Sequence, residues 1–352
     1  MNAVSSSESF NLIRSANWFP GEFEDSKFIS EQSGIPQDVI EKKMGIIKKC
    51  RAPLDCHPSQ MAINAAKMAL EGIDPDSIDL VIWTGSEYKD YHVWSAGIFV
   101  QRELGLRKAW AFDMAARCSS NVVGLKIAKN MMMADRKIKR VLLCGGHRTG
   151  DLVNYKDPTS RFLYNLSDGG AAMVVERSDK EEFNPILEAS ILTDGDFSLD
   201  VIIPGGGTKK RSRDGLEEFD TYLTCPDIQG MRERLADRSI ENFLHVIKES
   251  ATESMDKPID YLALLHMKKS AHDAIVDGLE LKAEQSIYLD HYGHFGAPDQ
   301  VLSLGLAERR GLLKKGDHVN LASAGIGYTW SALSLRWDGD CYNQKGLDPY
   351  EA

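Results

Sequence analysis

Short apolar segments alternate along the chain with longer segments in which apolar residues recur at helical spacing. The short segments predict buried strands at residues 78–84, 109–114, 140–145, 169–176, 259–265, 287–289, 318–322 and 332–337. The longer segments predict helices at residues 60–71, 96–104, 119–135, 240–254, 271–279 and 298–309. Alternation of this kind predicts an α/β fold in which helices cover the faces of the sheets.

The order of elements in the first half of the chain recurs in the second half. The segment IDLVIWTGS at residues 78–86 resembles IDYLALLHM at residues 259–267. Residues 109–128 and 286–307 likewise both combine a strand, a turn and an apolar helix. The recurrence predicts a duplication with two similar halves, residues 1–180 and 181–352. Residues 195–225, rich in Gly, Lys, Arg and Asp, are expected to form a long loop.

Composition excludes several classes of protein. The chain has 352 residues, of which 43% are hydrophobic and 27% charged, and this composition is that of a globular protein. A formal net charge of −10 argues against a general nucleic-acid binder. No apolar run approaches the roughly 20 residues of a membrane span. The N-terminal residues lack the pattern of a secretory signal, so we expect a cytoplasmic protein.

One of the six cysteines has the surroundings of a nucleophile. Cys118 lies between the predicted strand 109–114 and the predicted helix 119–135, where helix N–H groups and the helix dipole favour a thiolate. Small side chains around it leave room for a substrate, and these belong to Ala115, Ala116, Ser119 and Ser120. A packed core cysteine is the alternative. No CxxC pair occurs, and the pair His291 and His294 lacks further ligands, so no metal site is expected.

Several motifs in the same order resemble a known family. The segment FDMAARCSSNVVGLKIA around Cys118 resembles the nucleophile segment of β-ketoacyl-acyl-carrier-protein synthase III, in the thiolase superfamily. SDGGAAMVVE (167–176), PGGGT (204–208) and KKGDHVNLASAGIGYTWSALSLRW (314–337) resemble its later motifs. The resemblance spans most of the chain. It implies a thiolase fold of five layers, αβαβα, with two pseudo-symmetric halves, an active site between them, and a homodimer.

The resemblance implies an acyltransferase in which Cys118 carries the acyl group and two partners assist. His266 matches the family's histidine, although the family's His-Gln-Ala-Asn sequence is replaced here by His-Met-Lys-Lys. His294 stands where the family has asparagine, in Tyr-Gly-His instead of Tyr-Gly-Asn. Chain-elongating relatives use a Cys-His-His set, so the replacement is compatible with condensation.

The role of His294 leaves the acceptor open. A neutral imidazole can donate a hydrogen bond to the enolate of a malonyl-type thioester, which predicts condensation to a β-ketoacyl product. An imidazole can also act as a base toward a hydroxyl, an amine or water, which would give acyl transfer without decarboxylation, or thioester hydrolysis. A non-catalytic partner subunit is the second alternative. The departures at Val39, Lys269 and His294 favour specialised lipid or secondary metabolism over housekeeping fatty acid biosynthesis.

The resemblance also assigns the oxyanion hole and the substrate-binding residues. The oxyanion donors are the backbone N–H groups of Cys118 and Ile326, and Gly325 and Gly327 beside Ile326 allow a close approach. Lys43 takes the place of a family arginine that holds coenzyme A, whereas Val39 replaces its stacking tryptophan. The remaining substrate-binding residues are expected at the acyl-pocket gate and in the glycine loop, and they are Val93, Trp94 and Gly206.

The expected substrates are acyl thioesters of coenzyme A or of the phosphopantetheine arm of an acyl-carrier protein. A basic cluster around residues 42–51 on an acidic chain suits either of these phosphate-bearing partners. No tightly bound cofactor is expected, because the cysteine itself carries the acyl group.

Overall fold

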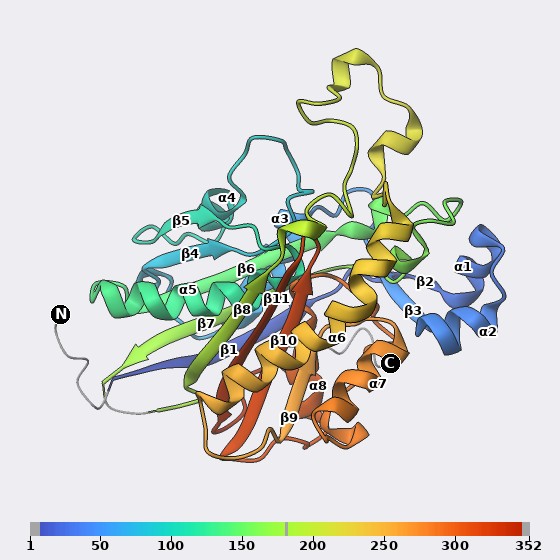
Figure 1. Ribbon diagram of the computed structural model, residues 1–352. Coiled ribbons are helices and arrows are strands. Elements are labelled where there is room, and N and C mark those ends of the chain that lie inside the picture. Colours follow the sequence, from blue (N-terminus) through green and yellow to red (C-terminus); the bar gives the residue numbers. More distant parts are fainter. Residues whose placement is uncertain (1–7, 180–181, 347–352) are drawn as a thin grey trace.

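The computed structural model describes residues 8–179 and 182–346, and its body is built on two mixed sheets (Figure 1). The five-stranded sheet has the order β1 (Ser9–Trp18), β7 (Asp168–Ser178), β6 (Arg140–Arg148), β4 (Leu80–Trp83) and β5 (Trp110–Asp113). The four-stranded sheet has the order β8 (Ile186–Thr193), β11 (Thr329–Trp337), β10 (Asp317–Gly325) and β9 (Tyr261–Leu264).

β4 and β9, one in each sheet, read as continuous apolar runs because both of their faces are covered. All four residues of β4 are buried, and β4 pairs in parallel with β5 and β6. β9, also fully buried, pairs in parallel with β10. Long antiparallel pairs, β1 with β7 and β10 with β11, complete the two sheets.

Helices complete a five-layer arrangement around the two sheets. α5 (Ser120–Ala134) and α8 (Asp299–Arg309) lie between the sheets, where a large apolar cluster includes Leu125, Leu143, Leu302 and Leu335. α3 (Pro58–Ala69) and α4 (Ala96–Glu103) cover the outer face of the first sheet. α6 (Ile228–Thr252) and α7 (Lys269–Gly278) cover the outer face of the second sheet. The architecture is the predicted αβαβα thiolase fold.

A small subdomain flanks one end of the sheets. It consists of the two-stranded ribbon β2 (Glu22–Asp25) and β3 (Lys48–Arg51), with α1 (Ser26–Ser33), α2 (Gln37–Val39) and a π-helical turn, η1 (Ile40–Met44). Figure 1 shows this unit at the side of the molecule opposite the free end of α5. η1 leads into Gly45, whose carbonyl reaches the site described below.

The structure departs from the sequence-based expectation in several elements. Residues 287–289 form no strand, and α6 begins at Ile228 instead of residue 240. β1 was not predicted because its apolar pattern is interrupted by Ser15 and Asn17, which are fully buried polar residues. The predicted boundary between the halves, at 180/181, lies outside the described residues. Residues 204–221 project from the layered body as a loop with short 3₁₀ turns (Figure 1).

No helix within residues 8–179 and 182–346 combines the length and apolarity needed to cross a membrane.

Candidate active site

Cys118 lies between the end of β5 and the start of the central helix α5. A short 3₁₀ turn, η3 (Arg117–Ser119), contains the cysteine and leads directly into α5 at Ser120. The residue before it, Arg117, has φ of 53°, a left-handed conformation that is uncommon for a side chain other than glycine. Cys118 is half-buried, whereas the other five cysteines are buried free thiols. The turn therefore presents one accessible thiol at the start of a buried helix.

The glycine loop of the second half packs on the turn that holds Cys118. The Ser323 hydroxyl donates to the Cys118 carbonyl at 2.7 Å. A Cβ added at Gly325 would lie 2.5 Å from the Ala116 carbonyl oxygen and 3.2 Å from the Cys118 nitrogen. Only glycine permits this approach, which brings the loop containing Ile326 against the nucleophile turn.

His294 reaches Cys118 from the loop that precedes α8. Its Nε2 lies 3.0 Å from Cys118 Sγ, although the two residues are 176 positions apart in the chain. Its backbone is fixed by the 165–167 segment: the His294 N–H donates to the Asn165 carbonyl at 2.7 Å, and the Ser167 N–H donates to the His294 carbonyl at 2.9 Å. Asn121, three positions after Cys118, donates from Nδ2 to the Ala297 carbonyl at 2.8 Å. This hydrogen bond joins the helix that follows Cys118 to the loop that contains His294.

Asp299, the first residue of α8, completes a line of three side chains. His294 Nδ1–H donates to Asp299 Oδ2 at 2.6 Å, so Nε2 of the same ring faces the cysteine. Asp299 is fully buried and also accepts from the backbone N–H groups of His266 (2.8 Å) and Phe295 (3.1 Å). These two donors hold the carboxyl group in a fixed orientation at the start of α8. The arrangement Asp299–His294–Cys118 matches the geometry of a hydrolase-type triad.

The charges around His294 favour its protonated ring when the cysteine is a thiolate. Burial by itself would lower the pKa of His294, but the charges of Cys118 and Asp299 and its hydrogen bonds to both raise that pKa well above its usual range. The site therefore favours a protonated His294 ring, whose Nε2 faces Cys118 Sγ at 3.0 Å.

His266, at the end of β9, has a different environment. Asn165 Nδ2 donates to its Nδ1 at 3.0 Å, so the ring hydrogen lies on Nε2, which donates to the Gly45 carbonyl at 2.9 Å. Burial, opposed by the bond to Gly45 and the charge of Asp299, lowers the pKa of His266 to about 4. His266 is thus a neutral N–H donor, whereas His294 is poised to hold and release a proton. A substrate oxygen would receive the His266 hydrogen only after the Gly45 carbonyl moves away.

A third histidine lies close to this group. His147, at the end of β6, is buried, packs against Gly296 and leaves Nε2 without a hydrogen-bond partner. Burial and the charge of His294 lower the pKa of His147 to about 3. His147 is therefore a neutral neighbour of the His294 loop.

The predicted substrate-binding residues lie at different distances from this centre. Lys43 is exposed on η1, two residues before Gly45. Val93 is fully exposed with φ of 50°, and Trp94 packs against Tyr91 with ring centroids 5.6 Å apart. Gly206 is exposed in the projecting loop, and Gly327 follows Ile326 in the loop that covers Cys118. Within residues 8–179 and 182–346, no hydrogen bond, ion pair or ring contact joins Cys118 to Lys43, Val93, Trp94 or Gly206.

Asp299 and Asn165 were missed by sequence reasoning. The signal for Asp299 was present, since an acidic residue at the start of a predicted helix follows His294 by five positions. Asn165 gave no signal, because it precedes β7 and meets His266 only through the packing of the two halves.

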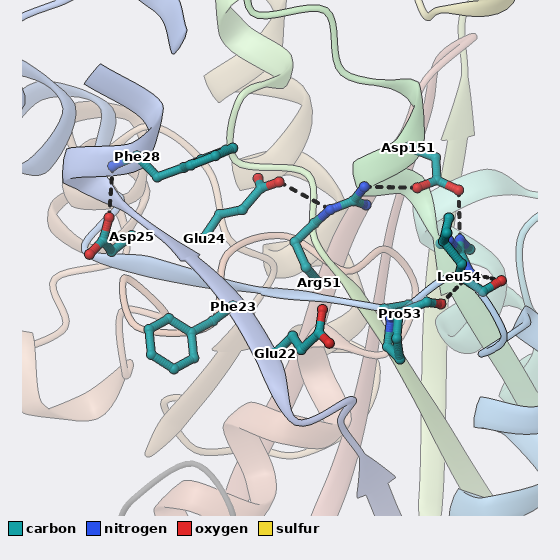
Figure 2. Close-up of a pocket in the computed structure, with 11 residues that line it drawn as sticks. Glu22, Phe23, Glu24, Asp25, Phe28, Arg51, Pro53, Leu54 and Asp151 are labelled. Carbon is teal, nitrogen blue, oxygen red and sulfur yellow. Dashed lines mark hydrogen bonds and ion pairs between the residues drawn. The ribbon is translucent and has the colours of Figure 1, made fainter. Parts of the chain in front are cut away.

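A separate surface pocket of about 510 Å³ lies beside β2 and β3, and Figure 2 shows the residues that line it. Arg51 projects into it but is already paired with Glu24, Asp151 and Asp168 at 2.8 to 3.1 Å. Neither Cys118, His266 nor His294 lines this pocket. The other arginine of the lining, Arg148, is paired with Asp151, so none of the residues that line the pocket offers a free cation to an anionic ligand.

Comparisons with known proteins agree with the architecture. Residues 112–195 match the family model described as 3-oxoacyl-[acyl-carrier-protein (ACP)] synthase III, and residues 250–337 match the model of its C-terminal part. A β-ketoacyl-[acyl-carrier-protein] synthase III from Bradyrhizobium sp. (strain BTAi1) is 28% identical, with 85% of this chain and 90% of that protein covered. One from Syntrophomonas wolfei is also 28% identical, with 86% and 89% covered.

Solved structures show the same fold. The 3-oxoacyl-(acyl carrier protein) synthase III of Pseudomonas aeruginosa PAO1 superposes with a TM-score of 0.82 at 20% identity, covering 94% of this chain and 98% of that chain. The priming β-ketosynthase of the R1128 polyketide pathway superposes with a TM-score of 0.81 at 19% identity, covering 96% and 99%. Because both halves match the family models and the relatives extend over most of the sequence, the chain belongs to the β-ketoacyl-[acyl-carrier-protein] synthase III-like family.

Proposed function

We propose that the chain is an acyltransferase that carries an acyl group on Cys118 and condenses it with a malonyl-type thioester to a β-ketoacyl product. The observation that carries this proposal is the 3.0 Å contact between Cys118 Sγ and His294 Nε2, at the junction of the two halves. Membership of the synthase III-like family supports the same chemistry.

Acylation uses the thiolate–imidazolium pair. The Cys118 thiolate attacks the carbonyl carbon of the donor thioester, and the backbone N–H groups of Cys118 and Ile326 hold the developing oxyanion. The donor carbon–sulfur bond then breaks, and the departing thiol takes its proton from His294 Nε2. The acyl-enzyme retains a neutral His294 that is still held by Asp299.

Condensation uses the neutral donor. The malonyl thioester loses CO₂, its enolate carbon attacks the acyl carbon on Cys118, and the Cys118 carbon–sulfur bond breaks. His266 Nε2–H stabilises the enolate oxygen once that oxygen has replaced the Gly45 carbonyl. His294 Nε2 then receives a proton from the medium, which restores the ion pair with the Cys118 thiolate.

The donors are acyl thioesters of coenzyme A or of an acyl-carrier protein, and no tightly bound cofactor takes part. Lys43 and the loop containing Gly206 bind the phosphate-bearing arm: both are exposed, and Lys43 lies two residues before Gly45, whose carbonyl accepts from His266. The reaction takes place in the cytoplasm, in specialised lipid metabolism. The two halves, residues 1–180 and 181–352, each contribute part of the site.

The working unit is a homodimer in which the loop around Val93 contacts the partner and gates the acyl pocket. Val93 is 107% exposed and strained, and three further apolar residues near the free edge of β5 are also exposed, namely Tyr91, Ile98 and Trp110. Several exposed apolar side chains near one sheet edge are typical of an interface.

Intact-mass spectrometry tests the acyl-enzyme directly. Incubation with a series of acyl-coenzyme A thioesters should add one acyl mass to the wild type and to Cys225→Ala, a control that removes a buried cysteine. Cys118→Ala should show no adduct. Malonyl thioester added to the acyl-enzyme should then release CO₂ and a β-ketoacyl thioester. An undiminished adduct in Cys118→Ala would refute the assignment of the nucleophile.

A further inference from the structure

We propose that the acyl-Cys118 enzyme also transfers its acyl group to the hydroxyl of an alcohol, with His294 as the general base and Asp299 as its orienting carboxylate. This inference rests on the proposed acyl-enzyme and names a second class of acceptor for the same site. It starts from the three aligned side chains, Asp299 Oδ2 to His294 Nδ1 at 2.6 Å and His294 Nε2 to Cys118 Sγ at 3.0 Å.

Acylation changes what His294 faces. Before acylation, Nε2 shares a proton with Sγ. After acylation the sulfur carries the acyl group and has no proton, so Nε2 lies beside the acyl carbon with its lone pair free. A hydroxyl that approaches this carbon comes within hydrogen-bond reach of the same nitrogen, and this is the geometry required of a general base.

The groups around His294 support its return to the neutral form in the acyl-enzyme. They are Cys118 on η3, Asp299 on α8, His266 after β9 and His147 on β6. The charge of Cys118 is one cause of the raised pKa of His294, and acylation removes that charge. Asp299 remains and stabilises the imidazolium that forms when the base takes a proton.

An alcohol fits this site better than an aliphatic amine, because the base and its neighbours are buried. His294 and His266 are 7% and 2% exposed, and Asp299 is fully buried. An aliphatic amine, with a pKa near 10.4, would enter as a cation beside an imidazole. A hydroxyl is neutral, and it needs the base that the triad supplies.

The transfer step is balanced. The hydroxyl oxygen attacks the acyl carbon while its proton moves to His294 Nε2, and the oxyanion forms at the backbone N–H groups of the hole. The carbon–sulfur bond of acyl-Cys118 then breaks, and the sulfur leaves with the proton from Nε2 or as the thiolate paired with it. The products are an ester and the free enzyme.

The two acceptor classes require different properties of residue 294. The decarboxylated malonyl carbon brings no proton that must be removed, whereas the hydroxyl does. An asparagine at this position can donate a hydrogen bond but cannot accept the hydroxyl proton. The substitution His294→Asn therefore separates the two reactions.

The test uses full-length enzyme acylated with acetyl-coenzyme A and freed from excess donor. Single-turnover loss of the acetyl adduct is followed by intact mass, and the acetate ester by mass spectrometry, with 1-butanol and 1-octanol as probe alcohols and malonyl-coenzyme A in a parallel reaction. The variants are His294→Asn and Asp299→Asn. His291→Asn, at an exposed histidine three residues away, is the matched control.

We expect ester from the wild type and from His291→Asn, at a rate that rises with pH as His294 loses its proton. His294→Asn should lose about 10²–10⁴-fold in ester formation, the usual contribution of a general base, and far less in condensation. Asp299→Asn should lower ester formation and flatten its pH profile while the melting temperature shows a folded protein.

Two results would overturn the inference. One is an acyl-enzyme that condenses with malonyl-coenzyme A but yields acetate, or no product, with both alcohols. The other is equal loss of ester formation and condensation in folded His294→Asn. Absence of any acyl-enzyme is a different result, because it would refute the proposed function itself.

Discussion

Asn165→Asp should convert His266 from a neutral donor into a group that titrates near neutral pH. The amide Nδ2 of Asn165 lies 3.0 Å from His266 Nδ1 and forces the ring hydrogen onto Nε2. A carboxylate in its place would accept a hydrogen from Nδ1. The neutral ring would then present a lone pair, instead of an N–H group, to the Gly45 carbonyl and to any substrate oxygen.

The size of the expected pKa change of His266 follows from the new carboxylate charge and its distance from the ring. The pKa of His266 is lowered to about 4, mainly by burial. An opposite charge within 4–6 Å raises the pKa of its partner by roughly 1–3 units, which places His266 in the variant at about 5–7. Each unit corresponds to about 1.4 kcal/mol of preference for the imidazolium.

Histidine-selective ¹⁵N NMR between pH 5 and pH 8 measures the effect. The wild-type His266 ring should stay neutral with its hydrogen on Nε2 across this range, whereas the ring in Asn165→Asp should titrate. The condensation rate of the variant should change with the same midpoint. Asn130→Asp adds the same charge at an exposed position and should leave both readouts unchanged. An unchanged ring signal in folded Asn165→Asp would show that Asn165 does not set the protonation of His266.

Three further predictions concern the backbone, the pH dependence of stability and the dimer. Gly293→Ala, at φ +72°, would place a new Cβ 2.7 Å from a backbone oxygen, so it should destabilise the fold by more than the roughly 1–2 kcal/mol of a left-handed alanine and impair acylation. Gly72→Ala, at φ +79° in open space, should destabilise the fold by only about 1–2 kcal/mol. Urea unfolding measures both changes. In the folded protein the pKa of His266 is about 4 and that of His147 about 3, whereas both are about 6.5 in the unfolded chain. Below pH 6.5 the unfolded chain therefore binds more protons than the folded protein does. The free energy of unfolding should therefore fall as pH decreases from 6.5 to 4, by up to about 1.4 kcal/mol per pH unit and histidine, and a flat profile would contradict this. Val93→Phe should shift kcat/KM toward shorter acyl chains in a protein that sediments as a dimer, and a monomer with an unchanged preference would argue against the gate.

The sequence by itself predicted the fold and singled out Cys118 as the candidate nucleophile. β4 and β9 are buried along their whole length, so they read as apolar runs. The recurrence of strand, turn and helix indicated two related halves. Cys118 was recognisable because its signal is local: small residues surround it between a buried strand and a buried helix. Local signals also placed His294 at the entrance of a second central helix, where the structure has α8.

The tertiary structure alone decided what each histidine is chemically. His266 and His294 are the same residue type, but their surroundings differ. Asn165 and Gly45 fix His266 as a neutral donor, whereas Asp299 and Cys118 favour the protonated ring of His294. The partners of His266 come from segments 101 and 221 positions away in the chain. Protonation depends on burial and on charges within a few ångströms, and the sequence order of the residues does not specify those distances.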